Sequence, residues 1–581
     1  MVYLNEFPCQ PPKSQLELPS LPSLPIDILR IHARHDRLPL MTENLRTLEV
    51  NQGSKIAEIL EAFESGNQDL LVIDQATVVT KPHLELLTDY PRTVTTALVS
   101  KVKGGETRVS QGRITGATSG FHEVGHGNHT FLGAIRLSQS QRAEIIEILT
   151  KIKNTNHAGD AIDLVLVALV RAALVVAPAE VAGAPFIRST DLAERTRVAK
   201  QISELNDARL RLKLANRAND GFYSVFVLRK FSKLFTWLAV RLKMTPNQVT
   251  LISFAVGLFS AYEFSRGTFW TIFAGAVLLQ LSIIIDCVDG ELARYTRQFS
   301  QLGAWLDAIT DRIKEYLVFF ALAYGSAKSG RDLWIPAMGM MLFQTFRHIS
   351  DYNFARINKV RSSQLAPMDF EIKNDGYVAT EREKKSRLEY WSKKAVQFPI
   401  GERWLVISAS SVIGGAAFTF TIMPILGLIS IALVFRGRIR KTLTWPKERV
   451  NNQLVDFQID SFNSKNTTNR FDWLVPSLLR LLEGVIFIEL AVVTDLDRSK
   501  LFLILFAILF NHYDNMYRAL QNEAKPKWLS ILGGFIFGRL ALIAIWVWFE
   551  IPLLPLIYYF SVLFFFVSSA QWISTHIAKR N

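Results

Sequence analysis

The chain has 581 residues, of which 49% are hydrophobic and only 20% are charged, and its formal net charge is +14. Together with a mean hydropathy of +0.18, this composition excludes a disordered chain, a fibrous repeat and a wholly soluble enzyme. Two cysteines exclude a disulfide framework, and basic runs that flank apolar stretches favour membrane topology over a nucleic-acid partner.

The N-terminal third of the chain predicts a soluble region. Residues 1–25 contain the proline-rich run LPSLPSLP, which should be extended, and they lack the features of a signal peptide, so we expect a cytoplasmic N-terminus. Between residues 26 and 198, apolar runs of strand length alternate with helical segments, which predicts an α/β domain with a largely parallel sheet. The runs are 70–73, 94–99, 131–135 and 174–177, and the helical segments are 55–63 and 142–151.

Residues 199–244 predict a linker that ends in an amphipathic helix. Within 222–243 an apolar stripe recurs every three or four residues, and Arg229 and Lys233 are among the basic residues that lie off it. The stripe consists of Val227, Phe231, Leu234, Phe235, Leu238 and Leu242. An apolar segment follows directly, so we favour a helix on the cytoplasmic leaflet over a linker helix packed on the soluble domain.

From residue 249 onward, long apolar segments predict ten transmembrane helices, since a span needs about 20 residues. The predicted spans are 249–262, 269–285, 302–324, 333–349, 404–420, 422–435, 473–493, 501–520, 528–548 and 552–572. The basic segments 353–403 and 436–449 should be cytoplasmic. We therefore expect a multi-pass protein with membrane domains at 245–449 and 473–581, joined by a linker at 450–472.

Four acids lie where the second predicted span ends and the third begins. At 100° per residue, Asp286 and Asp289 share one helical face, and Asp307 and Asp311 share another. A charge within a span costs about 2.5–3.5 kcal/mol, and four acids on facing helices also repel one another. Two divalent cations would resolve both problems, because they offset four charges and suit carboxylate oxygens.

Small and basic residues are interleaved with these acids. Gly290 and Gly303 allow a close helix approach or let a phosphate touch the backbone, and Arg294 can hold a phosphate oxygen. The alternative, in which the acids only line two helix ends in water, suits one or two acids but not two helical pairs with this spacing. The pattern favours a metal site that contacts phosphate.

The pattern Asp286-x2-Asp-Gly-x2-Ala-Arg-x8-Gly-x3-Asp-x3-Asp311 resembles the full signature of the CDP-alcohol phosphotransferase family, and the resemblance covers about residues 245–434. It implies a six-helix membrane bundle in which Asp311 is the base that deprotonates the acceptor hydroxyl. Two Mg²⁺ or Mn²⁺ ions would be held by Asp286, Asp289, Asp307 and Asp311. The family's contacts with the CDP-alcohol fall on Asn247, Thr250, Gly290, Ala293, Arg294, Ser300 and Gly303. Arg403 falls in the family's acceptor pocket, and we add Arg347 and His348 as basic residues that suit an anionic acceptor.

By this resemblance, an acceptor alcohol attacks the β-phosphorus of a CDP-alcohol such as CDP-diacylglycerol, and CMP leaves. The expected partners are membrane lipids, the CDP-alcohol and an anionic or polyol acceptor. A homodimer is a further possibility that the sequence leaves undecided. Inositol phosphate, glycerol phosphate, another polyol phosphate and a lipid alcohol remain alternative acceptors. Two alternative functions are a non-catalytic membrane scaffold or transporter with an inherited motif, and a bifunctional nucleotidyltransferase/phosphotransferase. The location implied is a bacterial plasma membrane, with the active site on the cytoplasmic side.

The N-terminal domain carries a second resemblance. The segment LVIDQATV at 71–78 is similar to the strand that ends in a metal-binding acid in the sugar-nucleotidyltransferase fold, which places Asp74 at that position. No Gly-rich, Arg-containing loop follows a first strand, so a triphosphate lacks its backbone cradle. We expect Asp160 and Asp163 to be helix-end or surface acids. The region 26–198 is therefore predicted to be nucleotidyltransferase-like but catalytically silent, with a role in regulation or assembly.

The last four predicted spans resemble no family and contain a second set of charges, which we expect to be buried. These are Arg480, Glu483, Glu489, His512, Asp514, Arg518 and Arg539. Ionisable groups inside a membrane favour a functional site, and the alternative is a set of structural ion pairs at helix ends. If these spans help to bind the acceptor, their charges should approach the same membrane face as the four acids.

Overall fold

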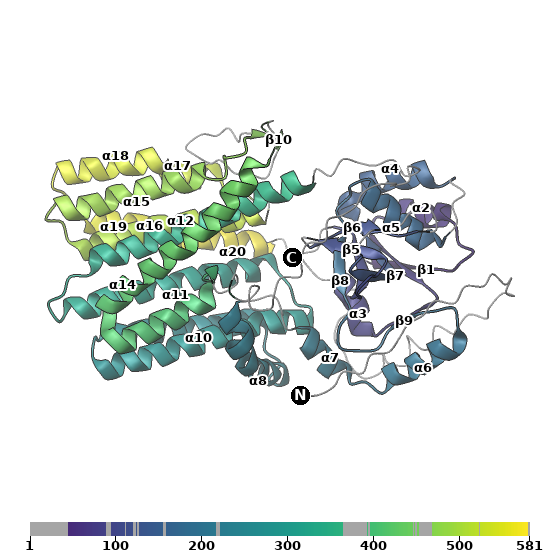
Figure 1. Ribbon diagram of the computed structural model, residues 1–581. Coiled ribbons are helices and arrows are strands. Elements are labelled where there is room, and N and C mark those ends of the chain that lie inside the picture. Colours follow the sequence, from purple (N-terminus) through teal and green to yellow (C-terminus); the bar gives the residue numbers. More distant parts are fainter. Residues whose placement is uncertain are drawn as a thin grey trace.

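The computed structural model describes residues 45–88, 94–110, 112–119, 124, 127–154, 159–215, 221–363, 392, 396–445, 447, 450–451, 467–521, 523 and 525–578. The predicted proline-rich segment 1–25 and most of the predicted linker 450–472 lie outside these residues. An α/β region lies at one end of a long helical bundle (Figure 1).

The α/β region is built on a seven-stranded mixed sheet whose main path runs β1-β2-β7-β4-β8. These strands are β1 (Leu45–Val50), β2 (Asp69–Asp74), β7 (His129–Leu137), β4 (Thr96–Lys101) and β8 (Ala177–Glu180). Only β1–β2 and β4–β8 are parallel, while β7 is antiparallel to both of its neighbours on this path. The prediction of a largely parallel sheet is wrong. The chain goes from β4 to β7 through the hairpin of β5 (Thr107–Ser110) and β6 (Arg113–Ala117), not through a crossover helix, which a parallel pair requires.

Apolar residues on both faces of this sheet are covered. On one face, α2 (Ile56–Glu64), α4 (Arg142–Ile152) and α5 (Ala161–Arg171) bury the larger core. A smaller cluster on the other face includes residues near α3 (Lys81–Glu85). The short strands β3 (Thr77–Val78) and β9 (Ile187–Arg188) pair with each other, and the chain continues through α6 (Leu192–Ser203) and α7 (Asp207–Leu214) toward the bundle.

The predicted amphipathic helix is formed by a π-helical turn (Ser224–Leu228) followed by α8 (Arg229–Arg241). The apolar side chains of Phe231, Leu234 and Leu238 are exposed, whereas Ser232 and Thr236 on the opposite side are buried. The apolar stripe thus faces outward, as a helix in contact with lipid requires, and the polar side packs against the bundle.

The first part of the bundle contains α9 (Pro246–Ser265), α10 (Phe269–Thr296), α11 (Gln301–Ala327), α12 (Trp334–Ser363) and α14 (Ile400–Leu443). Thr245 begins α9 with a capping box that pairs it with Gln248. Non-helical angles at Gly415 (φ 71°, ψ −167°) break α14 into two helices. Glycine tolerates this conformation because it has no Cβ. The break lies inside the predicted fifth span, so the predicted boundary between spans five and six is wrong by several residues.

The second part comprises α15 (Val475–Val493), α16 (Arg498–Leu520), α17 (Lys527–Leu532), α18 (Phe535–Trp548), α19 (Leu554–Ser561), a π-helical turn (Val562–Val567) and α20 (Ser568–Ala578). Figure 1 shows these helices alongside α11 and α12. Helix α16 packs against both α11 and α12, and its residues from Leu501 to Asp514 include almost only buried side chains. One continuous hydrophobic core joins both parts of the bundle.

Four helical stretches among the described residues are long and apolar enough to cross a membrane. They are 269–296, 400–443, 527–548 and 554–577. These stretches mark the chain as a membrane protein. Helices also occupy the other predicted spans, but α11, α12 and α16 carry buried ionic groups that lower their hydropathy. The count of ten spans stays a prediction.

Candidate active site

Three of the four predicted metal-binding acids meet between α10 and α11. Asp286 on α10 and Asp307 and Asp311 on α11 offer carboxylate oxygens that all lie within 4.8 Å of one another. The connection between the helices is short: Arg297 ends α10 in the left-handed conformation (φ 59°), and the Ser300 side chain caps α11. A tight turn thus brings an acid from one helix against an i, i+4 pair on the next. Such a set of hard oxygens fits a divalent cation.

Asp289 lies outside this group of three. It is buried, and the Thr250 hydroxyl on α9 donates a hydrogen bond of 2.6 Å to its Oδ2. The structure therefore places the fourth predicted acid against α9, with one carboxylate oxygen already engaged by a residue that we expected to contact the CDP-alcohol.

Lys314 is a member of the site that the sequence analysis missed. Its side chain is 0% exposed, and Nζ lies 2.7 Å from Asp286 Oδ1 and 3.0 Å from Asp311 Oδ1. Gly257 on α9 makes room for it, since a Cβ there would lie 2.6 Å from Lys314 Cδ. The indole ring of Trp404 lies 5.2 Å from Nζ. One oxygen of each of the two carboxylates is thereby occupied by a buried cation. The sequence signal was a lysine three residues after Asp311 inside an apolar helix.

Glu291, next to Gly290 in the motif, was also missed. It is buried and accepts hydrogen bonds from Arg229 Nη1 (2.7 Å), Ser232 Oγ (2.8 Å) and Thr236 Oγ1 (2.6 Å). All three donors lie on the inward side of the amphipathic helix α8. The ion pair between Arg229 on α8 and Glu291 on α10 thus joins α8 to the helix that carries Asp286, although the two residues are far apart in the sequence.

The residues predicted to contact the CDP-alcohol lie on α9, α10 and the start of α11. Asn247 and Ser300 lie against Gly303, where a Cβ would be 2.7 Å from Asn247 Oδ1 and 2.8 Å from Ser300 Oγ, so only glycine fits without displacement. Gly290, Ala293 and Arg294 follow Asp289 along α10. Arg294 Nε donates to the backbone oxygen of Ala215, at the end of α7, so this predicted phosphate ligand contacts the segment that leads to the α/β region.

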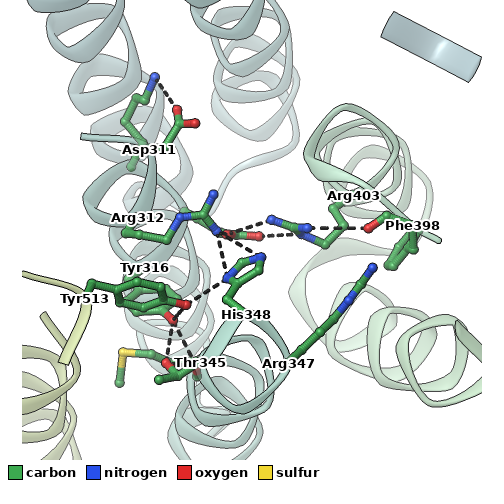
Figure 2. Close-up of polar contacts among 12 residues, drawn as sticks. Asp311, Arg312, Tyr316, Thr345, Arg347, His348, Phe398, Arg403 and Tyr513 are labelled. Carbon is green, nitrogen blue, oxygen red and sulfur yellow. Dashed lines mark hydrogen bonds and ion pairs between the residues drawn. The ribbon is translucent and has the colours of Figure 1, made fainter. Parts of the chain in front are cut away.

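A cavity of about 380 Å³ lies beside Arg312, the residue after Asp311. All three residues predicted for the acceptor pocket line it (Figure 2). Its full lining is Arg312, Arg347, His348, Asp351, Gln397, Pro399, Ile400, Arg403, Val434 and Arg438. The structure adds Arg312 and Arg438 to the predicted set.

Two carboxylates hold the arginines of this cavity in place. Glu315 is fully buried and accepts from Arg312 Nη1 (2.8 Å) and Arg403 Nε (2.9 Å). Asp351 forms an ion pair of 2.6 Å with Arg438. Four lining arginines against these two carboxylates leave two positive charges in excess, which suits an anionic ligand.

A second group of acids lies in the α/β region, at the carboxyl end of β2. Arg188 contacts Asp74 (2.7 Å), Asp160 (3.0 Å) and Asp163 (2.8 Å). Asp160 is the residue that directly precedes α5 and Asp163 lies in its first turn, so both are helix-end acids as expected. Burial lowers the pKa of Arg188, but the hydrogen bonds and charges of Asp163 and Asp74 outweigh it and hold the pKa above its usual value. The charged guanidinium of Arg188 thus occupies the place among these carboxylates where a metal ion would bind.

The charges of the C-terminal helices form two buried networks. Glu483 pairs with His512 (2.8 Å) and Arg539 (2.7 Å). Asp514 pairs with Arg518 (2.9 Å) and Lys525 (2.8 Å). Glu489 is exposed, so its predicted burial is wrong. This pairing favours the structural interpretation of these charges.

Comparison with known proteins assigns the region around the acid cluster. Residues 243–370 match the family model CDP-alcohol phosphatidyltransferase. The bifunctional IPC transferase and DIPP synthase of Archaeoglobus fulgidus is 37% identical over 152 residues, which are 26% of this chain and 30% of the relative. The archaetidylinositol phosphate synthase of Pyrococcus horikoshii is 38% identical over 84 residues, 14% of this chain and 43% of the relative. The phosphatidylinositol phosphate synthase of Streptomyces avermitilis is 36% identical over 123 residues, 21% of this chain and 49% of the relative.

The chain spans less than half the length of each of these curated relatives. Asp286, Asp307, Asp311 and Lys314 all fall inside the matched region. Residues 243–370 of this chain therefore form a CDP-alcohol phosphatidyltransferase domain.

Proposed function

We propose that the protein is an integral membrane transferase that moves the substituted phosphate of a CDP-alcohol, such as CDP-diacylglycerol, to an acceptor hydroxyl and releases CMP. The observation that carries this proposal is the convergence of Asp286, Asp307 and Asp311 within the CDP-alcohol phosphatidyltransferase domain. The names of the relatives, which are transferases and synthases, support it.

The site residues divide into positioning and proton-transfer roles. Divalent cations, Mg²⁺ or Mn²⁺, held by Asp286, Asp289, Asp307 and Asp311, would offset charge on the pyrophosphate oxygens. Asp311 accepts the proton of the acceptor hydroxyl, whose oxygen forms the new bond to the β-phosphorus while the bond to CMP breaks. Lys314 pairs with Asp311 Oδ1, which leaves Oδ2 for this proton.

The nucleotide half of the donor is assigned to the helix starts around the acids. Asn247 and Ser300 offer polar groups beside Gly303, where the absence of a Cβ lets both side chains lie close to the backbone. Thr250, Gly290, Ala293 and Arg294 complete the proposed CDP-binding set on α9 and α10. The proposed location of this site is the cytoplasmic face of the membrane, with α8 at the leaflet surface.

The acceptor is proposed to be a phosphorylated polyol. The excess of two positive charges in the cavity lined by Arg347, His348 and Arg403 favours an anionic acceptor over a lipid alcohol. Relatives named for archaetidylinositol phosphate and phosphatidylinositol phosphate support inositol phosphate as the first acceptor to test.

The proposal predicts CMP release by the purified full chain from CDP-diacylglycerol plus inositol phosphate or glycerol phosphate. EDTA should abolish the release and Mg²⁺ should restore it, because the carboxylates and the pyrophosphate are all negatively charged and repel one another without a cation between them. Liquid chromatography of CMP measures the result, with a lipid alcohol as the uncharged control acceptor. Absence of CMP with every donor and acceptor would favour the scaffold or transporter alternative.

The α/β region is proposed to be catalytically silent, because Arg188 already pairs with Asp74 and with both acids beside it. The full chain with CTP and inositol phosphate should therefore release no pyrophosphate, and Asp74→Asn should leave CMP release unchanged. A coupled pyrophosphate assay checks this. Pyrophosphate release that disappears in Asp74→Asn would instead establish the bifunctional alternative, which the names of some relatives suggest.

A further inference from the structure

The C-terminal helices touch the wall of the basic cavity although none of their described residues lines it. Tyr513 on α16 is fully buried, and its hydroxyl lies 2.8 Å from Nδ1 of His348, a lining residue. Figure 2 shows Tyr513 reaching His348 from the side opposite Arg403. One residue of the unassigned C-terminal part thus contacts the cavity wall directly.

Tyr513 is held from several sides. Tyr316 on α11 donates to its hydroxyl at 3.1 Å, and the Arg312 guanidinium lies 5.9 Å from the centre of its ring. The next residue, Asp514, accepts a hydrogen bond of 3.0 Å from Trp305 Nε1, which also belongs to α11. Two adjacent residues of α16 are therefore tied to the helix that carries Asp307 and Asp311, and the position of the Tyr513 hydroxyl is set by packing.

His348 in turn lies between Tyr513 and the arginines. Arg312 Nη1 lies 3.2 Å from His348 Nδ1, and the same Nη1 donates to Glu315, which also accepts from Arg403. A change in the orientation of the His348 ring would therefore move a donor group of the cavity and disturb the guanidinium beside it. The Tyr513 hydroxyl contacts the His348 ring from outside residues 243–443 and opposes such a change.

We propose that Tyr513 is a positioning residue for the acceptor, which acts by orienting His348, so that the C-terminal helices complete the acceptor site. The inference rests on the proposed transferase function. It assigns part of the acceptor binding to a helix outside the CDP-alcohol phosphatidyltransferase domain.

Tyr513→Phe tests this inference, because it removes the hydroxyl and keeps the ring. We expect the KM for inositol phosphate to rise about 3- to 10-fold, the range of one hydrogen bond. The KM for CDP-diacylglycerol and the melting temperature should match those of Tyr559→Phe. This matched control removes a hydrogen bond to the Leu532 carbonyl elsewhere in the C-terminal helices. A merely structural role would change the melting temperature and both KM values together.

A double-mutant cycle with His348→Ala shows whether Tyr513 affects the acceptor KM through His348 or through other residues. In the His348→Ala background, Tyr513→Phe should cause no further rise in the acceptor KM. An unchanged acceptor KM in Tyr513→Phe, or the same rise in both backgrounds, would overturn the inference.

Calorimetric binding keeps the inference separate from the transferase proposal. Inositol phosphate, glycerol phosphate and inorganic phosphate are titrated into the full chain without a CDP-alcohol, and the Kd should rise in Tyr513→Phe by the same factor as the KM. If the wild type binds at least one probe but releases no CMP, the transferase proposal fails while the role of Tyr513 is still measured. If the wild type binds none of the three, the inference is overturned.

Discussion

Asp311→Asn is expected to reduce CMP release by about 10²- to 10⁴-fold, the contribution of a general base. Asparagine keeps the shape of the side chain but cannot accept the proton of the acceptor hydroxyl, and it removes one charge from the group formed with Asp286 and Asp307. The loss should appear in kcat with saturating acceptor, because the cavity residues around Arg347 are untouched. Single-turnover CMP release measures it.

The control for Asp311→Asn is Asp332→Asn, the same chemical change at an exposed acid that pairs with Arg498. Both variants should melt as cooperative, folded proteins, and Asp332→Asn should retain wild-type turnover. Asp311 would not be the base if its variant kept more than about a tenth of wild-type turnover, a loss below about 1.4 kcal/mol in the barrier.

Lys314→Met is expected to lower the free energy of unfolding by about 3–5 kcal/mol in the absence of divalent cations, the cost of stranding a buried partner. Nζ lies within 3.0 Å of carboxylate oxygens of both Asp286 and Asp311, and methionine fills similar space without a charge. Added Mg²⁺ or Mn²⁺ should stabilise this variant more than the wild type. Among the described residues, Lys314 is the only basic side chain that forms an ion pair with Asp286 or Asp311, so its loss leaves these acids without a positive partner. Thermal unfolding with and without cation measures both effects.

Lys328→Met is the matched control, since Lys328 follows the same helix and is exposed, where substitutions usually change stability by less than about 0.5 kcal/mol. The role of Lys314 in offsetting the charge of Asp286 and Asp311 would be contradicted by either of two results. One is an equal melting temperature for Lys314→Met and Lys328→Met, and the other is an equal stabilisation of wild type and Lys314→Met by the divalent cation.

Local patterns predicted the parts of this protein that depend on near neighbours in the chain. Helical periodicity was sufficient to place Asp307 and Asp311 on one face, because i, i+4 residues meet on any α-helix. The same periodicity predicted an apolar stripe on α8 that faces the membrane leaflet, and Phe231 and Leu234 of this stripe are exposed. Helices occupy all of the predicted spans, since about 20 apolar residues have few alternatives in a membrane.

Long-range contacts were decided only by the tertiary structure. Lys314, Glu291 and Tyr513 each have a partner on another helix, and nothing in the spacing of residues along one helix specifies which helix packs beside it. The mixed sheet escaped prediction because strand direction depends on the path of each connection, and β4 reaches β7 through a hairpin. For the same reason the sequence placed Asp74, Asp160 and Asp163 only along the chain, while the fold shows that Arg188 forms an ion pair with each of them.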